Sequence, residues 1–236
     1  MTGFDVSSSE LYSGPVGIQV DLANGADSDA IEFVENRIVT FLKSLKAGFF
    51  FPGAFRGPAT EMVRVSGMSF YCQLEVVDLA TTAFDVLGGV LADCRHHEIS
   101  FRFAHAVFGN DRKDLLVETG QRPDAVHSPP FTVEFPTDLD GNYSLLVEIE
   151  FANPVASDLK QRLLDELALW DDLSFAYSED SDEQAPVSGA QGHFNDPRTI
   201  HHYEWVWEAE PAAWNLLVNL CCAWNRTLPI VRLHVE

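Results

Sequence analysis

Basic residues are scarce in this chain of 236 residues. Lysine and arginine number 15, only four of them lysine, against 36 aspartates and glutamates, and the formal net charge is −21 at pH 7. Such an excess of negative charge repels nucleic acid phosphates and anionic lipids and attracts basic proteins. We therefore expect a basic protein partner and no direct binding to nucleic acid or membrane. Acidity that serves only solubility, or that reflects the host's proteome, is the alternative.

Cysteines and long apolar runs are also few. Cys221 and Cys222 are adjacent on a predicted helix and cannot bridge easily, while Cys72 and Cys94 occupy apolar positions. No stretch approaches the roughly 20 apolar residues that a membrane span needs. Met1 to Gly14 lacks the basic and apolar regions of a signal peptide. These absences favour a reducing cytoplasm and exclude a disulfide or zinc framework.

What the sequence does contain is an internal repeat. The segment 16–24 (VGIQVDLAN) returns as 145–153 (LLVEIEFAN), at an offset of 129 residues. Near the ends of the two halves, 101–103 (FRF) returns as 231–233 (VRL), at an offset of 130. One register therefore holds across much of the chain, which indicates a module copied in tandem.

Both halves predict the same order of elements. Alternating apolar residues predict strands, and apolar residues three or four apart predict helices. In the first half, Asp29 with Glu32 resembles a capping box at a helix start, and Gly48 ends that helix. The predicted strands are 17–22, 49–51, 62–77 and 98–108 in the first half, and 145–151, 173–177, 200–208 and 230–235 in the second. The second half has helices starting at Ser157 and Pro211.

The order βαββαβ, found twice, resembles the ferredoxin-like fold. We therefore expect an α+β protein of tandem duplicated βαββαβ units, with antiparallel sheets and helices on one face. The expected domains are a first repeat at 1–110, an ordered linker at 111–142 that can add edge strands near 115–117 and 131–135, and a second repeat at 143–236. The acidic, polar stretch 178–192 is expected to be a mobile loop.

Side chains alternate along a strand, so residues between the core positions face the open side of each sheet. Tyr203, Trp205 and Trp207 align with residues of the first half that are expected to face the core. These three are therefore expected to face the core as well, and their neighbours along the strand to face outward. In the first half, Phe101 and Phe103 are expected to face inward, and Arg102 and Ala104 to face outward. Two ion pairs are predicted on the open faces. Arg102 should reach Asp21 in the first half, and Arg232 should reach Glu148 or Glu150 in the second. The candidate binding residues of the second half are Glu148, Glu150, His202, Glu204, Arg232 and His234, with Asp180, Asp182 and Glu183 from the acidic loop.

Three functions fit these features. The first is a non-enzymatic protein that engages a basic partner, such as an immunity-type or nucleic-acid-mimicking inhibitor. The second is an enzyme in which His202 and Glu204 share a metal, completed by His193 or Asp196, or act as a general base. The third is a structural module that forms homodimers through exposed sheet edges. We favour the first, and assign no catalytic residue, metal or cofactor, because no known catalytic motif is present.

Overall fold

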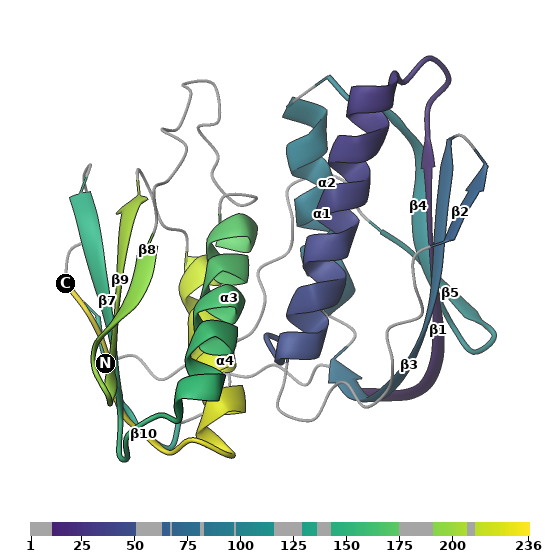
Figure 1. Cartoon of the computed structure of the whole chain (residues 1–236). Coiled ribbons are helices and arrows are strands. Elements are labelled where there is room, and N and C mark those ends of the chain that lie inside the picture. The colour runs from purple at the N-terminus through teal and green to yellow at the C-terminus, as the bar shows by residue number, and fades with distance from the viewer. Residues whose placement is uncertain are drawn as a thin grey trace. The chain divides into compact units, whose positions relative to one another are not determined.

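The computed structural model shows a mixed α+β protein that divides into two compact units between Asp124 and Ala125. In each unit two helices lie against one face of a five-stranded sheet (Figure 1). The structure describes residues 11–50, 63–66, 68–80, 83–96, 98–115, 129–135, 143–174, 191–206 and 211–236. Within these ranges, no helix is both long and apolar enough to span a membrane.

The first unit contains five strands and two helices. Its elements are β1 (Leu11–Leu22), α1 (Ser28–Ala47), β2 (Val63–Ser66), β3 (Ser69–Ala80), α2 (Ala83–His96), β4 (Phe101–Phe108) and β5 (Asp111–Asp114). The strand order is β2-β3-β1-β4-β5, and all neighbouring strands are antiparallel.

The second unit has a similar inventory. Its elements are β6 (Thr132–Glu134), β7 (Tyr143–Phe151), α3 (Ser157–Ser174), β8 (Gln191–Asp196), β9 (Thr199–Val206), α4 (Pro211–Asn225) and β10 (Ile230–Val235). The order is β6-β10-β7-β9-β8, with β6 parallel to β10 and the other neighbours antiparallel. Strands β5 and β6 lie within the predicted linker, 111–142. β6 lies where an edge strand was predicted near 131–135, and β5 ends at Asp114, just before the one predicted near 115–117.

Alternation and helical spacing explain both cores. In β1, Val16, Ile18 and Val20 are buried beneath the apolar stripe of α1, and in β7, Val147 and Ile149 are buried in the same way. The two helices of the second unit bury the predicted residues Leu163, Leu167, Trp170, Trp214, Leu217, Cys221 and Trp224. All four cysteines are free and buried, as predicted.

Helix α1 begins and ends at identifiable residues. Asp27 is the N-cap, and its carboxylate accepts a hydrogen bond of 2.8 Å from the Ala30 backbone N–H. The predicted start at Asp29 is therefore two residues late. Gly48 ends the helix with φ of 96°, a left-handed conformation that costs glycine little.

Two short predicted strands are wrong. Phe49 and Phe50 lie in a buried turn after α1, and Phe51 lies outside the described residues. The strand predicted at 173–177 begins inside α3, because Leu173 continues the buried side of that helix. The strand in this place is β8, whose first residues, Gln191 and Gly192, had been assigned to a mobile loop.

The predicted faces of β4 are right at Arg102, which is exposed, but wrong at Phe103 and Ala104. Ala104 is buried opposite Val20, whereas Phe103 lies opposite Asp21 and is only partly buried. The register shifts between Asp21 and Leu22, and such a bulge changes which residues of the neighbouring strand share a face.

The N-cap gives a first prediction. Asp27→Ala should lower the free energy of unfolding of the first unit by about 1 kcal/mol, because it leaves a helix N–H without its acceptor. Asp29→Ala is the matched control, and should cost about 0.5 kcal/mol or less through the helix dipole alone. Urea denaturation followed by circular dichroism measures both. A larger loss for Asp29→Ala would show that the helix is capped elsewhere.

Candidate functional site

Polar side chains line up across all five strands of the second sheet, on the face away from α3 and α4. Each residue of this set lies directly opposite the next one on the neighbouring strand. We call the set the cross-strand row; its members, from β6 through β10, β7 and β9 to β8, are Glu134, His234, Glu148, His201 and His193. Side chains opposite each other in a sheet are in contact distance, so the row is one continuous surface.

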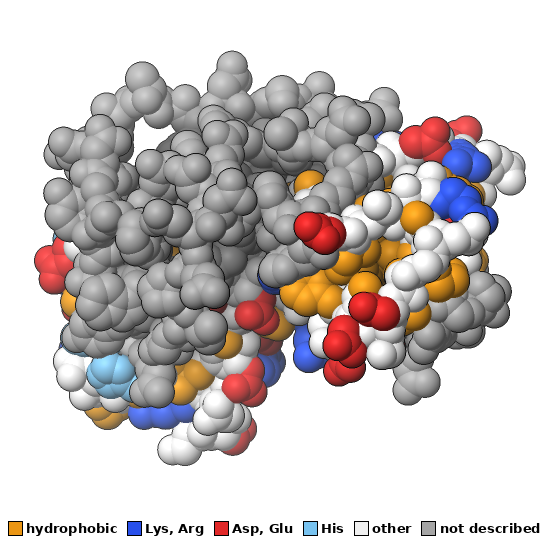
Figure 2. Space-filling model, turned by 90° about the horizontal axis from the view of Figure 1, so that it is seen from above, with side chains coloured by type: hydrophobic (Ala, Val, Ile, Leu, Met, Phe, Trp, Pro, Cys, Tyr) orange, Lys and Arg blue, Asp and Glu red, His pale blue; other side chains and the backbone are white. Residues whose placement is uncertain are grey.

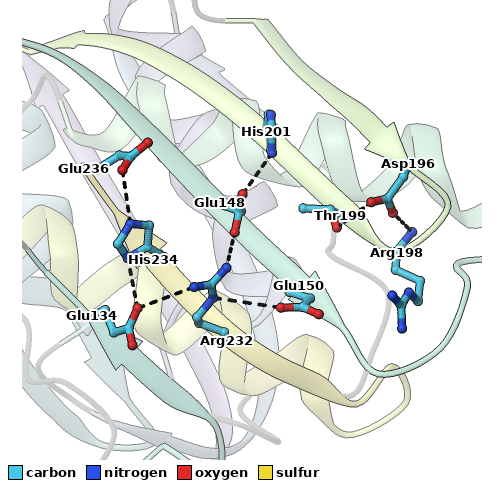
Figure 3. Close-up of polar contacts among 10 residues, drawn as sticks. All are labelled: Glu134, Glu148, Glu150, Asp196, Arg198, Thr199, His201, Arg232, His234 and Glu236. Atoms are coloured by element: carbon cyan, nitrogen blue, oxygen red, sulfur yellow. Dashed lines mark hydrogen bonds and ion pairs between the residues drawn. The ribbon is translucent and has the colours of Figure 1, made fainter.

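Glu148 lies at the centre of the row. One of its carboxylate oxygens is 3.0 Å from His201 Nε2, and the other accepts a short hydrogen bond from Arg232 Nη2 (Figure 3). Its side chain is only 22% exposed. Two cross-strand partners therefore fix the orientation of this carboxylate before any ligand arrives.

Arg232 links the row to a further carboxylate. Its guanidinium is 3.7 Å from Glu134 and 3.9 Å from Glu150, in addition to the contact with Glu148. The prediction that Arg232 reaches Glu148 or Glu150 is thus confirmed. In the first unit Arg102 does not contact Asp21; it donates instead to Asn24 Oδ1 at 2.7 Å, while Asp21 accepts from Gln19.

The surface around the row remains acidic despite Arg232. His234 lies between two carboxylates, with Nδ1 3.0 Å from Glu134 and Nε2 3.4 Å from Glu236 (Figure 3). Four glutamates and one arginine give this group a formal charge of −3 when its histidines are neutral. A group with this charge can attract a cation.

His202 does not lie on this face, contrary to the prediction. It is 1% exposed, pairs with buried Val147, and its Nε2 is 2.8 Å from Asp171 Oδ1 on α3. The prediction failed because it placed Tyr203 among the inward residues, whereas the ladder puts His202 at that position. A one-residue error in register moves every side chain of a strand to the other face.

The buried pair has an unusual electrostatic environment. Burial raises the pKa of the Asp171 carboxyl, and the hydrogen bond with His202 partly opposes that shift. The His202 ring also contacts Trp170 edge-on. On β8, Gly192 lies opposite His202, and a Cβ there would be 3.1 Å from His202 Nδ1. Glycine therefore leaves the room that the imidazole occupies.

The other predicted residues are placed as follows. Glu148, Glu150, Arg232 and His234 share the open face, as expected. Glu204 is on β9 opposite Leu145, and its side chain is outside the described part of the chain, as are Asp180, Asp182 and Glu183.

Sequence reasoning missed Glu134 and His201, and it named His193 and Asp196 only as loop residues. His193 is on β8 in the row, and Asp196 accepts hydrogen bonds from Arg198 N–H and the Thr199 hydroxyl in the β8–β9 turn. The apolar run at 131–135 predicted the edge strand that carries Glu134, but not the role of this side chain. Among the described residues, no three His, Cys, Asp or Glu side chains are grouped so as to hold a metal ion.

Comparisons of the chain with protein-family models, curated proteins and solved structures find no match. Function is therefore inferred from the chemistry of the open face.

The buried pair gives a second prediction. His202→Phe and Asp171→Leu should each destabilise the second unit by at least about 2 kcal/mol, because each leaves a buried polar partner unsatisfied. The double variant should cost less than the sum of the single variants. All five tryptophans are in the second unit, so tryptophan fluorescence during urea denaturation reports on this unit. Additive losses would mean that the two side chains are not energetically coupled.

Proposed function

We propose that this protein is a non-enzymatic acidic binding protein of the cytoplasm, and that the open face of its second unit engages a basic protein partner. We further propose that its units are tandem copies of one ferredoxin-like module. An immunity-type or nucleic-acid-mimicking inhibitor of a toxin or nuclease is a function of this kind. The cross-strand row is the observation that carries the proposal.

The topology of the units supports the duplication. The order β2-β3-β1-β4 in the first sheet corresponds to β8-β9-β7-β10 in the second, and these strands are antiparallel in both. The pairing corresponds residue by residue as well. Gln19 lies between Tyr71 and His105, and Glu148, 129 residues later, lies between His201 and His234.

The two copies differ in charge at these positions. In the first unit the central residue is the neutral Gln19, flanked by Tyr71, and burial lowers the pKa of His105, which favours its neutral form. In the second unit, Glu148 and His201 stand where Gln19 and Tyr71 stand in the first. At these equivalent positions the carboxylate and the second imidazole are therefore found only in the second unit, and this difference favours a specific role for its open face.

The geometry favours binding of guanidinium or ammonium groups. The carboxylates of Glu134 and Glu150 flank Arg232 and are 47% and 32% exposed, so a partner's cation can reach them. Held on paired strands, they lose little conformational freedom on binding. In the view from above, the described residues show acidic side chains interspersed with basic and apolar ones (Figure 2). A local acidic surface on a chain of −21 charge accelerates encounter with a basic partner.

A pair of matched charge variants tests the site. Glu134→Gln with Glu150→Gln should weaken binding of a fluorescent arginine–glycine repeat peptide by about five- to tenfold, because two carboxylates of the face are neutralised. Glu75→Gln with Asp111→Asn removes the same formal charge from exposed positions of the first unit. This control should change the Kd by less than about twofold. Fluorescence anisotropy at low ionic strength measures both.

Equal weakening by the two double variants would show that only net charge matters, and the proposed site would then be wrong. Absence of peptide binding by the native protein would contradict the proposed function itself.

A further inference from the structure

We infer that the cross-strand row couples binding of the cationic partner to the release of protons, so that mild acidification weakens the complex. This inference rests on the proposed function and names the regulation of the same face. It follows from the placement of three histidines among the carboxylates that a partner would use.

Each histidine of the row has a defined neighbour. His201 Nε2 is 3.0 Å from Glu148, and His234 is within 3.4 Å of both Glu134 and Glu236. His193 lies opposite His201, with their ring centroids 5.9 Å apart. A proton on His234 therefore lies against Glu134, one of the two carboxylates proposed to hold a partner's guanidinium. A proton on His201 lies against Glu148, which contacts the same Arg232 as those two carboxylates.

The charge change is large relative to the charge of the site. The four glutamates and Arg232 carry a formal −3, and protonation of His193, His201 and His234 would bring the sum to zero. Histidine as a residue type changes charge between about pH 5 and 8, where glutamates stay ionised. The attraction for a cation would therefore be lost while the carboxylates themselves remain charged.

Other described groups near the face do not reverse this sign. Arg232 is the cation between Glu134, Glu148 and Glu150, and its charge is already included in the formal sum. In the β8–β9 turn, Asp196 and Arg198 carry opposite charges, and Thr199 of β9 is uncharged. Asp171 and His202 are buried on the helix-covered side of the sheet and do not face the partner.

By thermodynamic linkage, protonation of the row and binding of the partner affect each other equally. If protons on the row weaken partner binding, then partner binding must expel protons by the same coupling free energy. Around pH 6.5 the complex should therefore form with net proton release. Calorimetry in buffers of different ionisation enthalpy measures this release directly.

The test uses the full chain and the fluorescent arginine–glycine repeat peptide, whose charge is constant over the range studied. At fixed ionic strength, Kd should rise about five- to tenfold from about pH 7.5 to about pH 5.5, as expected for adding up to three charges near the ligand. The triple variant His193→Gln, His201→Gln and His234→Gln should bind with nearly the same Kd at both pH values and release no protons.

His105→Gln, in the first unit, is the matched control and should keep the native pH dependence of Kd. Circular dichroism verifies that each variant is folded.

The outcomes separate the two claims. A native protein that binds the peptide equally at both pH values overturns the inference and leaves the proposed function standing. Persistence of the full pH dependence in the triple variant also overturns it, because the responsible groups would lie elsewhere. Failure of the native protein to bind at about pH 7.5 overturns the proposed function, and the inference falls with it.

Discussion

The hydrogen bond between His202 and Asp171, beneath the second sheet, is the interaction on which the arrangement of the open face depends. With the imidazole held against α3, His202 points inward, and alternation then directs His201 outward to Glu148. Gly192 on the next strand provides the space for the ring. A buried polar pair of this kind contributes little net stability compared with apolar packing, but it disfavours a shifted register that would leave either group unpaired.

The open face owes its chemistry to the register of four strand pairs. Because β6, β10, β7, β9 and β8 are aligned, residues far apart in sequence form one row of carboxylates and imidazoles. Arg232 is two residues before His234 on β10 and shares its face. It holds together three glutamates that would otherwise repel one another. The result is a surface with fixed carboxylates and a negative charge that protons can remove. The proposed binding and its proposed dependence on pH are thus two consequences of one arrangement.

Much of the fold could be predicted from the sequence, since the similar segments 16–24 and 145–153 contain β1 and β7, the central strands of the two sheets, and the helices show clear apolar spacing. Four of the candidate site residues could be predicted as well, because Glu148, Glu150, Arg232 and His234 alternate with buried neighbours. The faces of β4 and β9 could not be predicted: a bulge shifts the register of β4, and aromatic residues at 203, 205 and 207 gave β9 a misleading apolar alternation. The apolar run at 131–135 predicted edge strand β6, but so short a strand shows no periodicity from which the face of Glu134 could be assigned.

Native-state modification of histidine by diethyl pyrocarbonate, followed by peptide mass spectrometry, tests the central claim most directly. His201 is partly exposed and His202 is buried, although the two are adjacent in the chain. Our account predicts that His193, His201 and His234 react in the folded protein, and that His202 reacts only when urea unfolds the second unit. Reaction of His202 as fast as His201 in the native protein would contradict it, because the strand would then present the opposite face to solvent.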